Sequence, residues 1–210
     1  METVKSPAEQ KVILRNVSWE TYESLLSGRG ETRVPRFTYD QGMLEVMSPS
    51  SEHESISYYL GLLVALFAEE TGTDVYGVGS TTFKRADVQR GFEPDACFYI
   101  QNEELIRGKA RIDLDVDPPP DLVIEVDITS PSLDKLPIYA QMGVSEVWRY
   151  EGKDLSFLTL DNNEYSKVEK SIVLPPIAAQ SASKLVEKSK SLGFTYWLRE
   201  VRETARKGSI

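Results

Sequence analysis

The chain has 210 residues, of which 40% are hydrophobic and 27% are charged, and this is the balance of an ordinary globular protein. The length suits one domain spanning 1–210, with a core at about 18–160 and a helical extension at about 181–207. No apolar run is long enough to cross a membrane, and the polar N-terminus lacks the apolar segment of a secretory signal. Because Cys97 is the only cysteine, a disulfide framework and a thiolate metal site are excluded, and we predict a cytoplasmic protein.

The net charge of -9 argues against a protein that coats nucleic acid non-specifically, since phosphate binding depends on Lys and Arg. The charge is segregated along the chain. Residues 113–127 hold six acids and no Lys or Arg, whereas residues 184–207 hold seven basic residues and three acids. A local basic surface can coexist with an acidic total, so an enzyme that acts on nucleic acid is not excluded.

The first predicted elements are a helix, a hairpin and a longer helix. Ser18 is suited to cap a helix that starts at Trp19 and ends at Gly28. The segments 36–39 and 43–47 flank a turn with Gly42 and predict a hairpin. A long helix is expected from Pro49–Ser51 to Gly72, with a buried face at Ile56, Tyr59, Leu60, Leu63 and Phe67.

The rest of the chain alternates strands with helices. Strands are predicted at 74–78, 80–84, 96–100, 121–128, 146–150, 155–160 and 164–169. Helices or helical turns are predicted at 102–109, 131–142 and 181–207, and Pro137 makes a loop or kink in the first half of the second. The order describes an α/β domain with a mixed β-sheet flanked by helices.

Carboxylates on two predicted strands are the strongest candidates for a metal-binding or catalytic site. Glu125 stands inside the apolar run 122–128, where a carboxylate is costly to bury unless it is paired or binds a cation. Asp95 starts another apolar strand, and Asp127 shares a face with Glu125 because side chains alternate along a strand. Such acids suit Mg²⁺, which accepts a few carboxylates plus waters and phosphate oxygens. Any single acid is more often a turn cap or strand end, but Glu125 is hard to explain in that way.

Lys135 lies in the segment after that strand. If Leu133, Leu136 and Tyr139 make the core contacts, its ammonium would point back toward the strand end. There it would orient an attacking water or stabilise charge that develops in a transition state. The alternative is a solvated lysine or a partner of Asp134.

His53 is the only histidine. Helical spacing places it about 60° from the centre of the buried face at Ile56, whereas Glu54 falls on the opposite side. Ser51 and Glu54 have the spacing of a capping box, so that His53 is the better candidate for an interior site. A hydrogen-bonded histidine at the edge of the core is an equally good reading.

A set of motifs then gives a family resemblance. The motifs are Met47-Ser48-Pro49-x-x-Glu52-His53, Pro94-Asp95, Leu122-Val123-Ile124-Glu125-Val126, Ser130-Pro131-Ser132 and Tyr139-Ala140-x-x-Gly143-Val144-x-Glu146-x-Trp148. Together they resemble the bacterial family described as putative restriction endonuclease, within the PD-(D/E)XK nuclease superfamily. The resemblance covers roughly 18–160.

The resemblance implies a restriction-endonuclease-like core in which Asp95 and Glu125 bind Mg²⁺, or Mn²⁺ in its place. It implies that His53 occupies the position given by the first core helix. The motif lysine is expected two residues after Glu125, where this chain has Asp127. In this branch the lysine moves to the next helix, which fits Lys135. If Lys135 points away, catalysis is in doubt and Asp127 becomes an extra metal ligand.

Three functions follow from these observations. The leading hypothesis is a Mg²⁺-dependent endonuclease that acts on DNA rather than RNA. The second is a nuclease fold that no longer cleaves and serves as a binding or assembly module, and it rests on the acidic charge and on Asp127. A glycosidase with paired acids is a third, with no support beyond the acids. Edge strands and exposed aromatic side chains at Trp148 and Tyr150 predict a homodimer.

Overall fold

The computed structural model describes residues 9–30, 32–128 and 133–208. Its helices are α1 (Trp19–Arg29), α2 (Ser51–Thr71), α3 (Glu103–Ile106), α4 (Leu136–Met142), α5 (Ala179–Ser189) and α6 (Phe194–Gly208). Its strands are β1 (Gln10–Arg15), β2 (Arg36–Asp40), β3 (Met43–Ser48), β4 (Tyr76–Gly77), β5 (Phe83–Arg85), β6 (Arg90–Phe92), β7 (Ala96–Tyr99), β8 (Leu122–Asp127), β9 (Glu146–Glu151), β10 (Asp154–Asp161) and β11 (Glu164–Val168).

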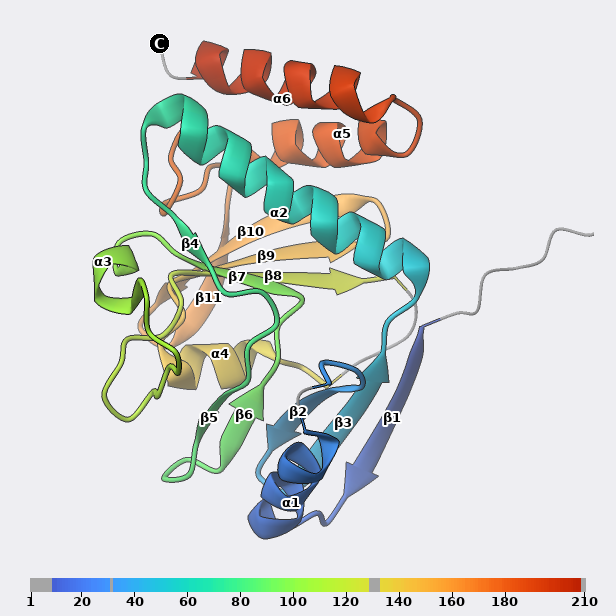
Figure 1. Ribbon diagram of the computed structural model, residues 1–210, viewed down its shortest axis with the longest axis vertical. Coiled ribbons are helices and arrows are strands. Elements are labelled where there is room, and N and C mark those ends of the chain that lie inside the picture. Colours follow the sequence, from blue (N-terminus) through green and yellow to red (C-terminus); the bar gives the residue numbers. More distant parts are fainter. Residues whose placement is uncertain (1–8, 31, 129–132, 209–210) are drawn as a thin grey trace, which may run out of the picture.

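The strands form two sheets. The six-stranded central sheet has the order β11-β10-β9-β8-β7-β4, and within it only β8 and β9 pair in parallel. The five-stranded N-terminal sheet has the order β1-β3-β2-β6-β5 and is antiparallel throughout. Helices α2 and α5 pack on one face of the central sheet, α6 packs on both of these helices, and α4 lies on the opposite face of the sheet (Figure 1). The predicted α/β class with a mixed sheet flanked by helices is confirmed.

Of the N-terminal sheet, the sequence predicted the hairpin β2–β3 but neither β1 nor β6. The Ser130-Pro131-Ser132 motif of the sequence analysis lies outside the described residues. Strand β1 follows a polar segment, and β6 has only three residues inside a turn-rich stretch. Strand β6 is held by pairing with β2, since Arg90 lies opposite Asp40, fifty positions away. Local periodicity carries no information on such distant pairing.

The helix predicted over 181–207 is two helices, α5 and α6, and the helices α1 and α2 each differ from the prediction at one end. Ser18 caps α1 as predicted, by accepting from the Thr21 N–H, but the helix continues past Gly28 and ends at Gly30. Ser50, rather than Ser51, caps α2 by accepting from the N–H of residue 53. The predicted capping box is therefore wrong, and Glu54 is free for another contact. Gly72 ends α2 in the left-handed conformation, as predicted.

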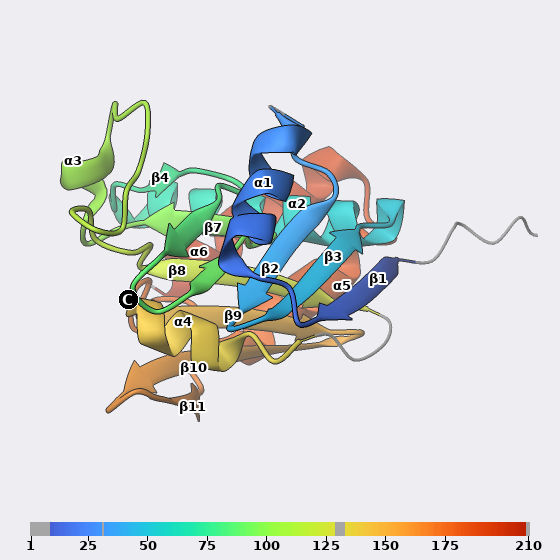
Figure 2. The ribbon, with the colours of Figure 1, turned by 90° about the horizontal axis from the view of Figure 1, so that it is seen from below.

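The N-terminal sheet has two unlike faces. Side chains that point to one face, among them Phe37 and Leu44, are buried with Trp19 and Tyr22 of α1, which lies along β2 (Figure 2). The alternate residues of β2 and β3 point to the opposite face, because side chains alternate along a strand. That second face carries Arg36, Thr38, Glu45 and Met47, all of them buried. The fold thus buries charged residues between its two sheets.

The C-terminal helices are a packed layer. Trp197 is fully buried, and its indole N–H donates to the Leu185 carbonyl at 2.7 Å. Arg206 of α6 forms a bidentate pair with Glu70 of α2. Arg202 and Arg206 therefore pair with acids of α2 and join α6 to that helix.

The expectation of exposed aromatic residues on β9 is wrong. Trp148 and Tyr150 are fully buried, and the ring of Trp148 stacks on Phe157 with centroids 4.3 Å apart. Both side chains lie on the face of the central sheet that α2, α5 and α6 cover, in one core cluster with residues of these helices. None of the described helices is long and apolar enough to cross a membrane.

Candidate functional site

The two acids singled out by the sequence lie side by side. Strands β7 and β8 are antiparallel neighbours, and the register that pairs Ala96 with Ile124 puts Asp95 beside Glu125. Asp95 also accepts a 2.7 Å hydrogen bond from the Val126 N–H, which fixes it against β8. Both carboxylates are almost completely buried. The structure therefore brings Asp95 and Glu125 into one buried site at the end of β8.

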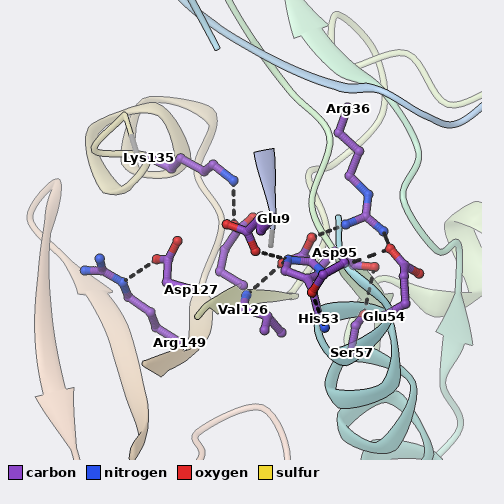
Figure 3. A network of polar contacts seen from close by, with 12 residues as sticks. Glu9, Arg36, His53, Glu54, Ser57, Asp95, Val126, Asp127, Lys135 and Arg149 are labelled. Carbon is purple, nitrogen blue, oxygen red and sulfur yellow. Dashed lines mark hydrogen bonds and ion pairs between the residues drawn. The ribbon is translucent and has the colours of Figure 1, made fainter. Parts of the chain in front are cut away.

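Asp95 is surrounded by positive groups (Figure 3). Arg36 of β2 donates to one carboxylate oxygen, and the His53 Nε2 lies 3.2 Å from the other. Burial would raise the pKa of Asp95, but His53, Arg36 and Lys135 together lower it. Asp95 is therefore ionised at neutral pH.

His53 lies at the inner edge of α2 and is fully buried. Burial would lower the pKa of its imidazole, but the carboxylates of Asp95 and Glu9 raise it. The Glu9 carboxylate lies 3.7 Å from Nε2. Glu54, on the other side of α2, reaches back to Arg36 at 2.7 Å. The prediction that His53 reaches the interior while Glu54 does not agrees with these positions.

Lys135 points into the site. It immediately precedes α4, and its ammonium donates to Glu125 Oε2 at 2.7 Å. Burial would lower the pKa of Lys135, but the carboxylates of Glu125, Asp95 and Glu45 outweigh this and raise it. Burial raises the pKa of Glu125 to about 7, against the opposing effect of Lys135. The ammonium thus faces the acids, which is the orientation that an active nuclease requires.

Tyr139 completes the surroundings of Glu125. It lies one helical turn after Lys135, so both side chains leave α4 on the same face. Its hydroxyl donates to Glu125 Oε1, the oxygen that Lys135 does not contact. Tyr139 was predicted only as a core contact, although its spacing of four residues from Lys135 is a sequence signal for this hydrogen bond.

Tyr139→Phe is expected to lower the free energy of unfolding by about 2 kcal/mol at pH 8, because a buried carboxylate loses a hydrogen-bond donor. The measurement is chemical denaturation. Tyr99→Phe is the matched control, since that hydroxyl donates to the neutral carbonyl of Pro118, and it should lose about 1 kcal/mol. Equal losses for the two variants would contradict a charged contact at Tyr139.

Asp127 lies at the end of β8 and forms ion pairs with two cationic side chains. Lys11 of β1 is 3.1 Å from one carboxylate oxygen, and Arg149 of β9 is 3.2 Å from the other. Burial would raise the pKa of Asp127, but Lys11 and the other nearby cations lower it. Its role as a metal ligand stays a prediction.

Sequence reasoning missed the residues that the N-terminal sheet contributes. Lys11 and Arg36 both lie opposite Met47 of β3, so they form one row across three strands. Glu45 lies two residues along β3 on the same face. Glu45 had the same signal as Glu125, a carboxylate within an apolar run, whereas Lys11 belongs to a strand that was not predicted.

The acids fit a hard divalent cation in number and kind. Among the described residues, no three Asp, Glu, His or Cys side chains gather closely enough to hold a metal by themselves. Mg²⁺ does not require such a set, because it commonly takes one or two carboxylates and keeps several waters. A cavity of about 20 Å³ beside Glu125, Lys135 and Tyr139 has room for one water-sized particle. Glu125 and Asp127 line this cavity, whereas Asp95 lies beside Glu125 on the neighbouring strand.

The fold and the site together define a nuclease-like α/β protein, and comparison with known proteins agrees. A crystal structure of a putative nuclease of the DUF820 group from Anabaena variabilis has a similar fold, with a TM-score of 0.50 at 12% sequence identity. The similarity covers 90% of this chain and 99% of that one. The family model described as putative restriction endonuclease matches residues 19–186, so the chain belongs to that family. A comparison with curated proteins found no match.

Proposed function

We propose that this protein is a Mg²⁺-dependent nuclease that hydrolyses phosphodiester bonds, with DNA as its substrate. The observation that carries the proposal is the orientation of Lys135. Its ammonium contacts Glu125 at 2.7 Å, beside Asp95, instead of pointing to solvent. Membership of a putative restriction endonuclease family supports a nuclease and gives no support to a glycosidase.

Each residue has a distinct part in this proposal. Asp95 and Glu125 would hold Mg²⁺, which lowers the pKa of a bound water and stabilises charge on the phosphate. Lys135 supplies a fixed positive charge for the transition state in a site from which most water is excluded. His53 and Arg36 keep Asp95 ionised and hold it in position. Tyr139 fixes the rotamer of Glu125 through its hydroxyl.

Cation binding should tighten as the pH rises, because the pKa of Glu125 in the metal-free protein is about 7. Below that pH the neutral carboxyl must lose its proton before it can bind a cation. The affinity for Mn²⁺ should therefore increase by about ten-fold between pH 6 and pH 8. Calorimetric titration at both pH values, in buffers of different ionisation enthalpy, measures the affinity and the proton released. An affinity independent of pH would exclude Glu125 as a ligand.

The second candidate is a nuclease fold that binds without cleaving. The observation in its favour is that Asp95, Glu125 and Asp127 all have cationic partners within the chain. Such ion pairs could hold the fold together without any metal. This candidate predicts cation or DNA binding with no cleavage.

A homodimer remains part of the proposal. Strand β1 is at the edge of the N-terminal sheet, and Val12, Ile13 and Leu14 on it are exposed apolar side chains. An edge strand with this character is a ready surface for pairing with a second copy.

A further inference from the structure

Glu45 is a buried acid that the proposed chemistry has not used. It lies in the middle of β3, on the face of the N-terminal sheet that points to the central sheet, and its side chain is 1% exposed. One oxygen, Oε2, accepts a 2.8 Å hydrogen bond from the Leu133 N–H. This contact fixes the carboxylate against the segment that leads into α4. Glu45 is thereby held at a set distance from Lys135, which precedes the same helix.

The other oxygen of Glu45 is aimed at the site. Oε1 lies 3.9 Å from the Lys135 ammonium and has no hydrogen-bond partner among the described residues. A buried carboxylate oxygen without a donor is costly, so its retention requires an explanation. Lys135 therefore lies between two buried carboxylates, in contact with Glu125 at 2.7 Å and within reach of Glu45.

A cation bound at Glu125 would change the electrostatic interactions of the Lys135 ammonium. The bound ion would neutralise Glu125 and repel the Lys135 ammonium from the oxygen that it now contacts. A buried ammonium cannot be left without an anionic partner except at a large cost in free energy. The free oxygen of Glu45 is the partner within reach, and a shift of about 1 Å would bring it into ordinary hydrogen-bond distance.

We propose that Glu45 is a positioning residue that receives Lys135 when a divalent cation occupies Glu125. It thereby lowers the cost of cation binding and holds the ammonium at a fixed place beside the ion. This inference rests on the proposed function in so far as a cation binds at Glu125. It adds a residue from the N-terminal sheet to the site, and it gives that sheet a part in cation binding.

The test is a double-mutant cycle read by Mn²⁺ calorimetry. Glu45→Gln keeps the shape of the side chain and an acceptor for the Leu133 N–H, but it removes the charge. We expect Mn²⁺ affinity to fall roughly ten-fold in Glu45→Gln, because Lys135 then has no second carboxylate. In a Lys135→Met background the same change should alter affinity by less than about two-fold, since no ammonium needs a partner.

The matched control is Glu103→Gln, which removes a buried acid at the start of α3 that pairs with Arg107, just after that helix. It should leave Mn²⁺ affinity unchanged. Thermal melts followed by circular dichroism identify any variant that fails to fold, and Glu45→Asp, which keeps the charge on a shorter side chain, then replaces Glu45→Gln. It should also weaken binding, because its oxygen is withdrawn from Lys135.

The outcomes separate this inference from the proposed function. If the parent binds Mn²⁺ and the Glu45 variant binds it equally well, the role of Glu45 is overturned while the metal site stands. An equal loss in the Lys135→Met background would also overturn it, because Glu45 would then act on the ion and not through the lysine. If the parent binds no divalent cation, the metal site of the proposed function fails together with this inference.

Discussion

Asp95→Asn is expected to abolish cation-dependent cleavage of DNA, with a fall in rate of at least about 1,000-fold. The substitution removes one of the two carboxylates suited to hold the ion, and the remaining one, Glu125, has a pKa of about 7. The asparagine amide group would also face a donor, either the Arg36 guanidinium or the Val126 N–H. Cleavage of a circular DNA at saturating Mg²⁺ measures the effect, and calorimetry measures the loss of Mn²⁺ binding.

Stability must be followed in the same variant. Asp95 is the buried partner of Arg36, and breaking such a pair costs about 3 kcal/mol. A thermal melt distinguishes a folded inactive variant from an unfolded one, and Glu125→Gln provides a second test with different neighbours. Glu104→Gln, at an exposed position on α3, is the control and should cleave at the parental rate. Folded Asp95→Asn and Glu125→Gln variants that cut at the parental rate would show that these acids are not the site.

Lys135→Met is expected to lower cleavage by about 100- to 1,000-fold while leaving Mn²⁺ binding intact. The ammonium contributes positive charge at the transition state, whereas the carboxylates that hold the ion remain in place. The variant therefore separates catalysis from cation binding, and single-turnover cleavage and calorimetry on the same preparation measure the two properties. This separation matters because the family motif places the lysine at position 127, which is an aspartate here.

The matched control for this variant is Lys109→Met, which removes a lysine that pairs with Asp117 far along the chain from the site. It should cleave like the parent. Full cleavage by Lys135→Met would show that another side chain supplies the positive charge at the transition state. Lys11, beside Asp127, would be the next residue to test. A loss of both cleavage and Mn²⁺ binding would instead assign Lys135 a structural part.

Local sequence signals predicted much of the central sheet and one half of the site. The apolar run around Glu125 predicted a central strand, and its buried carboxylate predicted a partner or a cation. Helical spacing placed His53 toward the interior, where it lies 3.2 Å from Asp95. These predictions succeeded because each depends on periodicity within a single element.

The other half of the site depends on contacts between distant segments. Arg36 meets Asp95 across fifty-nine positions, and Glu45 meets Leu133 across eighty-eight. Both contacts exist because the N-terminal sheet packs its charged face against the central sheet, and no local pattern encodes that arrangement. The exposure predicted for Trp148 was wrong for the same reason, since it is buried by helices that are distant in the sequence, α2, α5 and α6.

The central claim is tested most directly by cleavage of DNA with the parent protein. Circular, linear and single-stranded DNA are incubated with the protein in Mg²⁺ and, separately, in excess chelator, beside Asp95→Asn purified in the same way. We expect cleavage of DNA by the parent in Mg²⁺ and none in chelator or with the variant. If the folded parent binds Mn²⁺ but leaves all three DNA substrates uncut, the nuclease proposal is contradicted and the chain is a binding module.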